Sequence, residues 1–565
     1  LPVAGRRAFV AVEDVARYRD ALGVPLPGGL PRSLLEPVRD APGDLASRFA
    51  RSHGPFTSEM LASRYGLGKS IAEAMLARLA ESGRLMQGEF RPGGVEREWV
   101  DAEVLRRVRS RSLARLRREV EPVPTDALGR FLVSWHGIGS ARRGLEALLD
   151  AVEQLQGAPL PFSVLERDVL SARVADYEPG MLDTLIAAGE VVWSGVEPLG
   201  DRDGRIALYL TDHFARLGPS GSPATIEGRA GDILTYLRSH GASFFGAVHE
   251  GTGGGFPGET VDALWDLVWK GLVTNDTLHA LRALVGNSAA PARRMRRTAF
   301  RSRRQVPPTA EGRWALVHAP GPSRSATEWS SALSHQLLAR HGIVTRETAA
   351  SEAVVGGFSA VYQVLKAMEE AGRVRRGYFV AGLGGAQFAM PAALDLLRSL
   401  RDAPGEGTEG VAVRTPQVVM VSATDPVCPY GAIVEWPSAG WADEIAHVTG
   451  AKGVTPKGRG PTRTVGSMVI LVDGHAAAYL RRGERELLLL GAATEPSRST
   501  MTRETARALV RMSRSRDEGR QGLLIADIDG VAATTHPAAR LFLDAGFVAS
   551  AMGLQLRPGE KRVNM

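Results

Sequence analysis

The chain has 565 residues, of which 44% are hydrophobic and 23% charged, a composition that argues against wholesale disorder. At about 150 residues per domain, this length suggests about four domains. Lysine and arginine total 69 against 62 for aspartate and glutamate, so with a net charge of only +7 we expect basic patches rather than a uniformly basic surface. The single cysteine, Cys428, excludes a disulfide framework and every multi-cysteine zinc site.

The apolar runs of the chain are far shorter than the roughly 18 residues that a membrane-spanning helix needs. The first residues show no charged segment followed by an apolar one, so the sequence does not predict a signal peptide. Because the chain starts at Leu1, we expect it to be part of a longer protein. These features together predict a soluble, cytoplasmic, multi-domain protein.

Four segments repeat one pattern of helices, short apolar strands and glycines. One glycine follows the first helix of each segment, at Gly54, Gly157, Gly241 and Gly342, and a second follows the last helix, at Gly83, Gly189, Gly271 and Gly372. The two glycines are 29, 32, 30 and 30 residues apart. Seven residues before the second glycine the residue is always leucine, at Leu76, Leu182, Leu264 and Leu365. Large apolar residues also occur four before it and two after it.

This register predicts a winged helix, which is a helix-turn-helix followed by a β-ribbon. The apolar positions seven and four before the glycine lie on one helix face and point to a core. The glycine ends the helix because it adopts positive φ at little cost. The predicted recognition helices are Lys69–Ser82, Glu178–Ala188, Glu259–Lys270 and Gly357–Ala371, and wing hairpins are predicted over Met86–Val100 and Val191–Leu210.

In chain order, the pattern predicts an α+β protein with a tandem array of winged-helix modules followed by a β-barrel-like module. We expect an N-terminal linker over 1–41, a first module over 42–100, a basic helix and linker over 101–142, and a second module over 143–215. A third module over 223–290, an Arg-rich linker over 291–313, a fourth module over 325–402 and the β-barrel-like module over 411–565, with a C-terminal helix and strand, complete the chain. A weaker echo around Gly546 is a candidate fifth module.

Two arginine clusters flank the modules, one on the helix predicted after Asp101 and one in the Arg-rich linker. Each cluster alone is typical of a solvated face, but beside winged helices we expect contacts to DNA phosphates, which set affinity and salt dependence. The predicted DNA-binding residues are Lys69, Arg106, Arg107, Arg109, Arg111, Arg115, Arg293, Arg294, Arg296, Arg297, Arg301, Arg303 and Arg304. We expect only one or two modules to touch DNA, because acidic residues on the later recognition helices would repel its phosphates. These acidic residues are Asp262, Asp266, Glu369 and Glu370.

The segment GLGKS, residues 66–70, resembles the end of a phosphate-binding loop. It lacks the first glycine, which is Ser63 here, and it follows a predicted helix rather than a strand. We therefore interpret it as the turn of the first helix-turn-helix. The histidines before the first glycines share one repeat position, and no HExxH motif occurs, so the sequence predicts no metal site and no cofactor in this chain.

After about residue 410 the sequence alternates between short apolar strands, with a helix predicted near Thr502–Met512 and another before Gly546. Asp425 comes where a strand breaks into a loop and is the first candidate for an acid/base residue, with an Asx-type turn before Pro426 as the alternative. Asp529 in IADIDGV is the second candidate, although Asp529-Gly530 is also typical of a tight turn.

Several long phrases resemble the C-terminal half of bacterial large helicase-related proteins (Lhr), among them REWVDAEVLRRVRSRSLARLRREVEPV, LWDLVWKGLVTND, RHGIVTRET and ATDPVCPYGA. The resemblance covers nearly the whole chain. It implies a parent protein that is an ATP-dependent 3′–5′ DNA helicase acting in DNA repair, with ATP and Mg²⁺ bound by a helicase core that precedes this region. It also implies that this region binds DNA, single-stranded or as a tailed duplex, and self-associates, with a tetramer as the expected state.

The predicted layout is also similar to winged-helix DNA glycosylases, which implies excision of a flipped uracil base as an alternative function. Asp425 and Asp529 are the catalytic candidates for that reaction. The glutamine pair of the alkylpurine enzymes has no secure match, because Gln555-Leu556-Arg557 retains one glutamine only. A second alternative is a protein-interaction scaffold.

Overall fold

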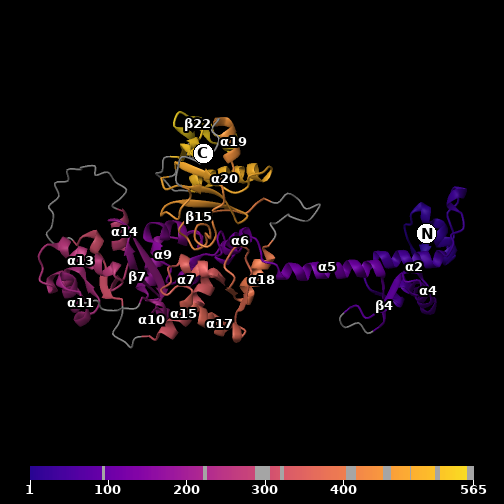
Figure 1. Ribbon diagram of the computed structural model, residues 1–565, viewed down its shortest axis with the longest axis horizontal. Helices are drawn as coiled ribbons and strands as arrows, with labels where there is room; N and C mark the ends of the chain where they lie inside the picture. The colour runs from indigo at the N-terminus through magenta and orange to yellow at the C-terminus, as the bar shows by residue number, and fades with distance from the viewer. Residues whose placement is uncertain are drawn as a thin grey trace, which may run out of the picture. The chain divides into compact units, whose positions relative to one another are not determined.

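The computed structural model describes residues 1–91, 96–219, 226–286, 306–317, 324–401, 415–449, 460–483, 485–515 and 522–556, without the side chains of 113–120, 448–449 and 515. The chain forms two compact units, Leu1–Glu121 and Pro122–Met565 (Figure 1). Within the described residues, no helix is both long and apolar enough to span a membrane.

The first module has the winged-helix order of elements. Its bounds are α2 (Ala41–Ser52), β3 (Phe56–Thr57), α3 (Ser58–Tyr65), α4 (Lys69–Glu81), β4 (Leu85–Gly88) and β5 (Glu98–Asp101). The strands form a sheet in the order β3-β5-β4, so the last wing strand lies between the other two. Gly66 ends α3 in the left-handed conformation and Gly68 precedes α4, which confirms GLGKS as the turn between two helices.

The same order of elements recurs in the second unit. The second module contains α7 (Gly144–Leu155), β6 (Leu160–Pro161), α8 (Phe162–Val164), the π-helical segment η3 (Leu165–Leu170), α9 (Pro179–Ala187), β7 (Val191–Pro198) and β8 (Gly204–Leu210). The third contains α11 (Gly228–His240), β9 (Ser243–Phe244), α12 (Phe245–Gly251), α13 (Pro257–Trp269), β10 (Val273–Asn275) and β11 (Arg313–Leu316). The fourth contains α15 (Ala326–His341), β12 (Ile343–Val344), α16 (Arg346–Ser351), α17 (Ser359–Glu370), β13 (Arg375–Gly377) and β14 (Gln387–Ala389). Their sheets, β6-β8-β7, β10-β11-β9 and β12-β14-β13, repeat the strand order of the first module.

The predicted glycine register is confirmed in all four modules. The second glycine has φ between 67° and 79° in each, at Gly83, Gly189, Gly271 and Gly372. The N–H of the following residue donates to the carbonyl of the apolar residue four before the glycine, at 2.8–3.0 Å, which is the Schellman helix ending. The leucine seven before the glycine is completely buried in every module. The four recognition helices therefore end and pack alike.

The C-terminal region contains a six-stranded sheet in the order β15-β16-β17-β18-β20-β21. Its strands are β15 (Val418–Ser422), β16 (Met468–Val472), β17 (His475–Leu480), β18 (Glu486–Leu489), β20 (Asp527–Ile528) and β21 (Val531–Ala532). α20 (Ser497–Ser515), where a helix was predicted, packs against this sheet, and α19 (Ala442–Thr449) lies nearby (Figure 1). In the described residues β15 and β21 do not pair with each other, so the sheet is open and the predicted barrel is not confirmed.

The weak echo around Gly546 has a structural counterpart. α21 (Ala539–Asp544) precedes Gly546, and the strands β19 (Leu524–Ile525), β22 (Val548–Ser550) and β23 (Gly553–Gln555) pair in the order β19-β23-β22. Gly546 has a φ of 110°, and the N–H of Phe547 donates to the carbonyl of Phe542 at 3.1 Å. The strand order and the helix ending thus repeat those of the four modules, although α21 has only six residues.

Residues 1–41 are not the linker that we expected. β1 (Pro2–Val3) pairs with β2 (Arg6–Arg7), and α1 (Val15–Leu22) packs against α2, with the short helices η1 (Val12–Asp14) and η2 (Arg32–Leu34) beside them. Val3 is buried in the core of the first module, and Tyr18 packs against that core. These apolar residues are too dispersed along the chain to form a helical or strand pattern, which is why the segment resembled a linker.

The expected linker after the basic helix was also wrong in part. The basic helix is present as α5 (Ala102–Val120), but α6 (Thr125–Trp135) follows it and is buried against the fourth module and the C-terminal sheet. Arg130, 4% exposed, donates to the carbonyls of Leu400, Arg401 and Asp473 at 2.7–2.9 Å. α18 (Pro391–Ser399) packs on the same helix. α6 is therefore a central helix of the second unit.

The third module extends beyond its predicted end at residue 290. Its last strand, β11, lies at Arg313–Leu316 and pairs with both β10 and β9. Part of the expected Arg-rich linker is thus the connection between two wing strands, in which α14 (His279–Gly286) and the short helix η4 (Pro308–Ala310) are described. The winged-helix sheet needs this third strand. The spacing of the glycines did not predict it, because an unusually long connection separates it from β10.

Candidate functional site

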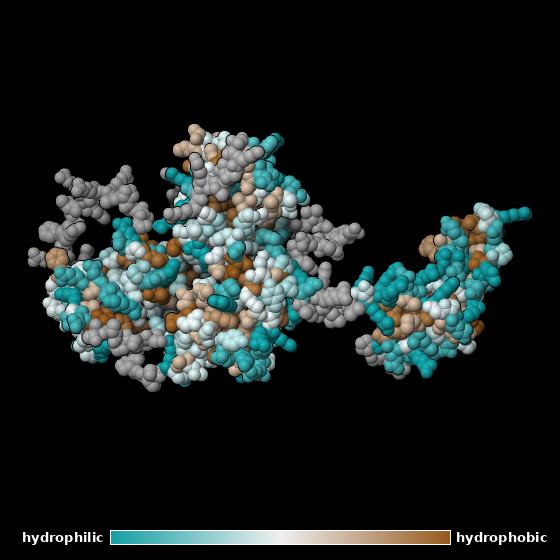
Figure 2. All heavy atoms as spheres, viewed as in Figure 1, coloured by the Kyte–Doolittle hydropathy of each residue, from teal (hydrophilic) through white to brown (hydrophobic). Residues whose placement is uncertain are grey.

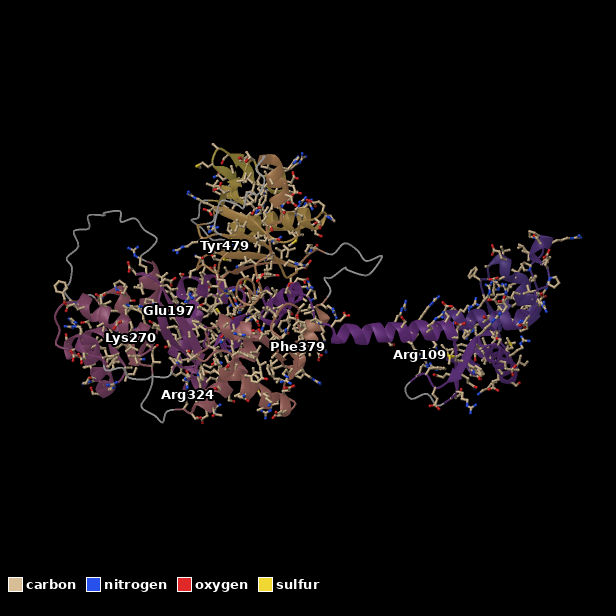
Figure 3. All side chains as sticks on the ribbon, viewed as in Figure 1. Arg109, Glu197, Lys270, Arg324, Phe379 and Tyr479 are labelled. Carbon is tan, nitrogen blue, oxygen red and sulfur yellow. The ribbon has the colours of Figure 1, made fainter. Side chains whose placement is uncertain are left out.

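The basic helix α5 exposes cationic side chains in the first unit. Asp101 accepts hydrogen bonds from the backbone N–H groups of Glu103 and Val104 at 2.9 and 3.2 Å, which caps the start of the helix directly after wing strand β5. Arg106, Arg107, Arg109 and Arg111 are all exposed, and Arg109 is labelled on α5 in Figure 3.

Glu103 is the acidic neighbour of this arginine group. Its carboxylate accepts from Arg107 at 2.9 Å and lies 3.5 Å from Arg106, and these arginines hold the pKa of Glu103 below its usual range. The side chain of Arg115 lies outside the described set, as do Arg293, Arg294, Arg296, Arg297, Arg301, Arg303 and Arg304. Lys69, at the start of α4, is half-exposed and 3.7 Å from Glu96.

The recognition helix of the second module, α9, carries Asp183, which is engaged by the third module. Arg282 of α14 donates to Asp183 at 2.6 Å and to Glu166 at 2.8 and 2.9 Å. The second and third modules also share one hydrophobic core. This helix is therefore committed to contacts between modules.

The wing of the second module lies directly on α13, the recognition helix of the third. A Cβ on Gly195 of β7 would be 2.2 Å from the carbonyl oxygen of Val268, and one on Gly204 would be 2.2 Å from the Trp269 ring. The Trp193 indole donates to the Asn275 carbonyl at 2.9 Å, which joins the two sheets. The exposed face of α13 is acidic, with Glu259, Asp262 and Asp266. Two of the four recognition helices are thus unsuited to a DNA groove.

α4 and α17 keep exposed faces. α17 exposes Ser359, Gln363 and Lys366, and the wing after it exposes Arg373, Arg375, Arg376 and Tyr378. The two acids that argued against this helix are paired, since Glu369 is 3.3 Å from Arg376 and Glu370 is 3.8 Å from Lys366. The wing arginines were not among the predicted DNA-binding residues, because they lie outside the recognition helix and outside the long arginine runs.

A cleft of about 1370 Å³ lies between the second and fourth modules. Its walls come from α7, from α10 (Thr211–Leu217) and from α15, and they present the guanidinium groups and amides of Arg142, Arg216, Arg324, Gln154, Gln156 and Gln336. Arg324, labelled in Figure 3, donates to the carbonyl of Arg216 at 3.0 Å. Trp135, His136 and Arg173 also line it. No local sequence pattern predicts this cleft, because its two walls are more than a hundred residues apart in the chain.

A buried polar network joins the two walls of the cleft. Arg340 of α15, 1% exposed, donates to the carbonyls of Gln154 and Gln156 and pairs with Glu352. Gln336 donates to the carbonyls of Glu153 and Gln154 at 2.9 and 3.0 Å. Burial raises the pKa of Glu352, but the charges of Arg340 and His341 outweigh it and hold the pKa at about 2. These buried contacts therefore hold the second and fourth modules together at one end of the cleft.

Asp425, the first predicted acid/base residue, is completely buried and forms an ion pair. Arg173 donates to both of its carboxylate oxygens, at 2.7 and 2.8 Å. The backbone N–H of Val427 donates to the same carboxylate at 2.9 Å, so the Asx-type turn that was the alternative is present. Asp425 itself does not line the cleft, whereas its partner Arg173 does. Its catalytic role stays a prediction.

Arg173 also fixes the state of His136. A guanidinium has no acceptor, so the 2.9 Å contact from Arg173 makes His136 Nδ1 the acceptor and places the ring proton of the neutral histidine on Nε2. Burial and the Arg173 charge lower the pKa of His136 well below its usual range. A neutral histidine with a defined tautomer therefore lines the cleft.

Asp529 lies in the β20–β21 turn at the far edge of the sheet from Asp425. Asp529 and Gly530 have φ values of 50° and 76°, which is the type I′ hairpin turn that the Asp-Gly pair is typical of. Its carboxylate accepts from the Leu489 N–H at 2.8 Å, and it is 2% exposed. The structure does not bring Asp425 and Asp529 together, because Asp425 follows β15 at one edge of the sheet and Asp529 precedes β21 at the other.

The histidines of the repeat position contact their own modules. His53 stacks on Phe49 and His240 on Tyr236, one helical turn earlier, with ring centroids 3.9 and 4.2 Å apart. His341 pairs with Glu352. The described residues contain no group of three or more histidine, cysteine or carboxylate side chains able to hold a metal ion.

Three segments match models of the winged-helix domains of the large helicase-related protein, over residues 323–409, 123–211 and 1–37. The chain therefore contains segments similar to the winged-helix domains of large helicase-related (Lhr) proteins. It is 41% identical over 517 residues to the "Lhr helicase/ probable uracil glycosylase" of Mycolicibacterium smegmatis, covering 88% of this chain and 33% of that protein. It is 32% identical over 588 residues to the "Lhr helicase/uracil glycosylase" of Escherichia coli K12, covering 98% of this chain and 36% of that protein.

The chain thus spans about a third of the length of these relatives. Two of the matched segments overlap the second and fourth modules, and the third lies in the folded N-terminal residues. Among solved structures, the chain is similar to the Streptomyces sahachiroi DNA glycosylase AlkZ, with a TM-score of 0.38 and 13% identity, over 69% of this chain and 97% of AlkZ.

Proposed function

We propose that this chain is the DNA-binding and self-associating region of an Lhr-type ATP-dependent DNA helicase that acts in DNA repair. The observation that carries the proposal is the exposed arginine group of α5, which continues directly from the wing of a winged-helix module. Cations in this position contact phosphates and make affinity depend on salt. ATP and Mg²⁺ would act in the helicase core of the parent protein, since GLGKS is a helix–helix turn that does not fit a nucleotide phosphate.

The test is binding of the whole chain to a labelled tailed duplex and to the matching single strand, by fluorescence anisotropy between 50 and 200 mM salt. Replacing Arg106, Arg107, Arg109 and Arg111 by alanine should weaken binding and lower the slope of log K against log salt by about one per lost phosphate contact. The control variant removes two exposed cations of the third module, Arg238 and Lys270. An unchanged slope in the α5 variant would contradict the proposal.

Self-association into a tetramer is the second part of the proposal. It follows the Lhr resemblance, and mass photometry of the purified chain tests it directly. A single species at four times the chain mass is expected, and a monomer at micromolar concentration would contradict it. A chain that associates but does not bind DNA at low salt would instead favour a protein-interaction scaffold.

A second candidate function is removal of uracil from DNA, because one relative is named a uracil glycosylase and the other a probable uracil glycosylase. The cleft favours it, because it is large enough for an extrahelical nucleotide. Gln154 and Gln156 stand one residue apart in its wall and place polar amide groups there. The Gln154 amide donates to the Trp135 carbonyl at 3.1 Å, and Gln156 accepts from the Leu210 N–H at 3.0 Å.

The test uses DNA with one uracil, scored for cleavage at the abasic site after alkali treatment. Asp425→Ala, Asp529→Ala and Gln154→Ala separate the three candidate residues, with circular dichroism to show that each variant is folded. Loss of cleavage in one folded variant would assign the activity to this chain. Cleavage by none of them, including the native chain, would reject this second candidate and leave DNA binding untouched.

A further inference from the structure

We infer that the fourth module is the part of the chain that reads duplex DNA, with α17 in the major groove and the β13 wing on the adjoining backbone. This inference rests on the proposed function and adds to it the surface that makes the contact and the form of DNA that it fits. Its starting point is that the four modules are built alike, so the same positions can be compared between them.

Charge separates the four modules. From the start of the recognition helix to the first wing strand, the second module has three acidic residues and no basic one, and the third has three acidic and one basic. The first has three basic and two acidic residues, and the fourth has four basic and two acidic. Repulsion from phosphates thus argues against the second and third modules, whose recognition helices also make contacts between modules.

The first and fourth modules differ in how their charges are placed. In the first module the wing strand β4, Leu85–Gly88, has no basic residue, and Arg78 of α4 pairs with Asp40. In the fourth module both acids are held by Lys366 and Arg376, so they do not face an approaching phosphate alone. Arg373 and Arg375 add exposed cations on the wing side. The fourth module therefore presents the larger positive surface.

The exposed face of α17 has the chemistry of a groove reader. Ser359, Gln363 and Lys366 lie on it, and the side chains of Gln and Lys make hydrogen bonds to adenine and guanine edges in the major groove. Ala367, small and exposed, lets the helix approach the bases. Figure 2 shows hydrophilic residues over the part of the second unit where α17 lies in Figure 1. Tyr378, 45% exposed, extends the same surface along the wing.

The test uses the whole chain with a 20-base-pair duplex and the matching single strand. Arg373→Ala with Arg375→Ala removes two wing cations without breaking the ion pairs of Glu369 and Glu370. Duplex affinity at 100 mM salt should fall about tenfold and the salt slope by about two, with a smaller loss on the single strand. Arg238→Ala with Lys270→Ala on the third module is the matched control and should lose less than twofold.

A second variant tests the helix separately from the wing. Gln363→Ala should reduce discrimination among duplex sequences while the salt slope stays unchanged, because it removes a base contact and no phosphate contact. If the native chain binds duplex in a salt-dependent way but the wing variant binds as the control does, the inference is wrong and the proposed function stands. Equal losses on duplex and single strand would also overturn it. If the native chain binds no DNA, both fail.

Discussion

Replacing Asp425 by alanine tests whether this carboxylate is a structural counter-ion. Its two oxygens each accept a hydrogen bond from the Arg173 guanidinium, at 2.7 and 2.8 Å, and the carboxylate accepts a third from the Val427 N–H at 2.9 Å. Asp425 is completely buried and Arg173 is 4% exposed. The substitution therefore leaves a guanidinium charge in the interior with no carboxylate and little access to water.

Removing one member of a buried ion pair costs about 3–5 kcal/mol of unfolding free energy, mostly because the remaining charge is uncompensated. We expect that range for Asp425→Ala. The double variant Asp425→Ala with Arg173→Met should be less destabilised than Asp425→Ala alone, since no charge is then left unpaired. Val427 would still lack its acceptor in both variants, so the difference between them reports the stranded charge, less the hydrogen bonds that Arg173 donates to His136 and to the Val169 carbonyl.

The assay is urea unfolding of the whole chain, with native-state hydrogen exchange to locate the change in a chain of several modules. Faster exchange should be confined to the second unit, around β15 and η3. Asp529→Asn is the control, because asparagine also suits the first position of a type I′ turn. If Asp425→Ala changes the unfolding free energy by less than about 0.5 kcal/mol, which is the range for surface sites, the counter-ion argument is refuted.

Two further perturbations test the packing of the second unit. The pKa of Glu352 is about 2 in the folded chain against an ordinary value of 4.5, so its ionised form stabilises the fold by about 3 kcal/mol. This contribution to the unfolding free energy is present above about pH 4.5 and is lost as the pH falls toward 2. In the Glu352→Gln variant, the unfolding free energy should change less between about pH 4.5 and 2 than in the native chain. The same pH dependence in both proteins would contradict a stabilising ion pair between Glu352 and Arg340. Gly129→Ala should destabilise more than Gly372→Ala in urea unfolding, because its Cβ would be 2.1 Å from the Gly474 carbonyl oxygen. A Cβ on Gly372 would have no neighbour within 4 Å, so only its positive φ of 72° would lower the stability, by about 1 kcal/mol. Equal losses of unfolding free energy in the two variants would show that the structure around Gly129 accommodates the added Cβ without cost.

The repeat could be predicted from the sequence because its signals are local. A leucine seven residues before a glycine, a second apolar residue between them and an apolar strand after them are all within one helix and its ending, where i, i+3 and i+4 contacts operate. The bounds of α4, α9, α13 and α17 therefore agree with the predicted recognition helices to within about two residues. The basic helix α5 was predictable for the same reason.

The sequence predictions were wrong for elements whose packing partners are distant along the chain. β11 joins β9 and β10 across a long wing connection, and α6 packs on elements that come hundreds of residues later, so no local pattern marks either one. Residues 1–41 looked like a linker because their few apolar residues are buried only against the folded first module. The predicted barrel depended on a closing strand pair, which only a tertiary structure can show.

By itself the sequence determined the register of the four repeated winged-helix modules, because helix periodicity and a glycine with positive φ act within about thirty residues. Only the tertiary structure decided which recognition helices are contacted by neighbouring modules, since Arg282 pairs with Asp183 of α9 and the wing of the second module lies on α13. It also decided what surrounds Asp425, because its partner Arg173 is 252 positions away in the chain. Charge pairing and burial depend on distance in space, and a single sequence states only distance along the chain.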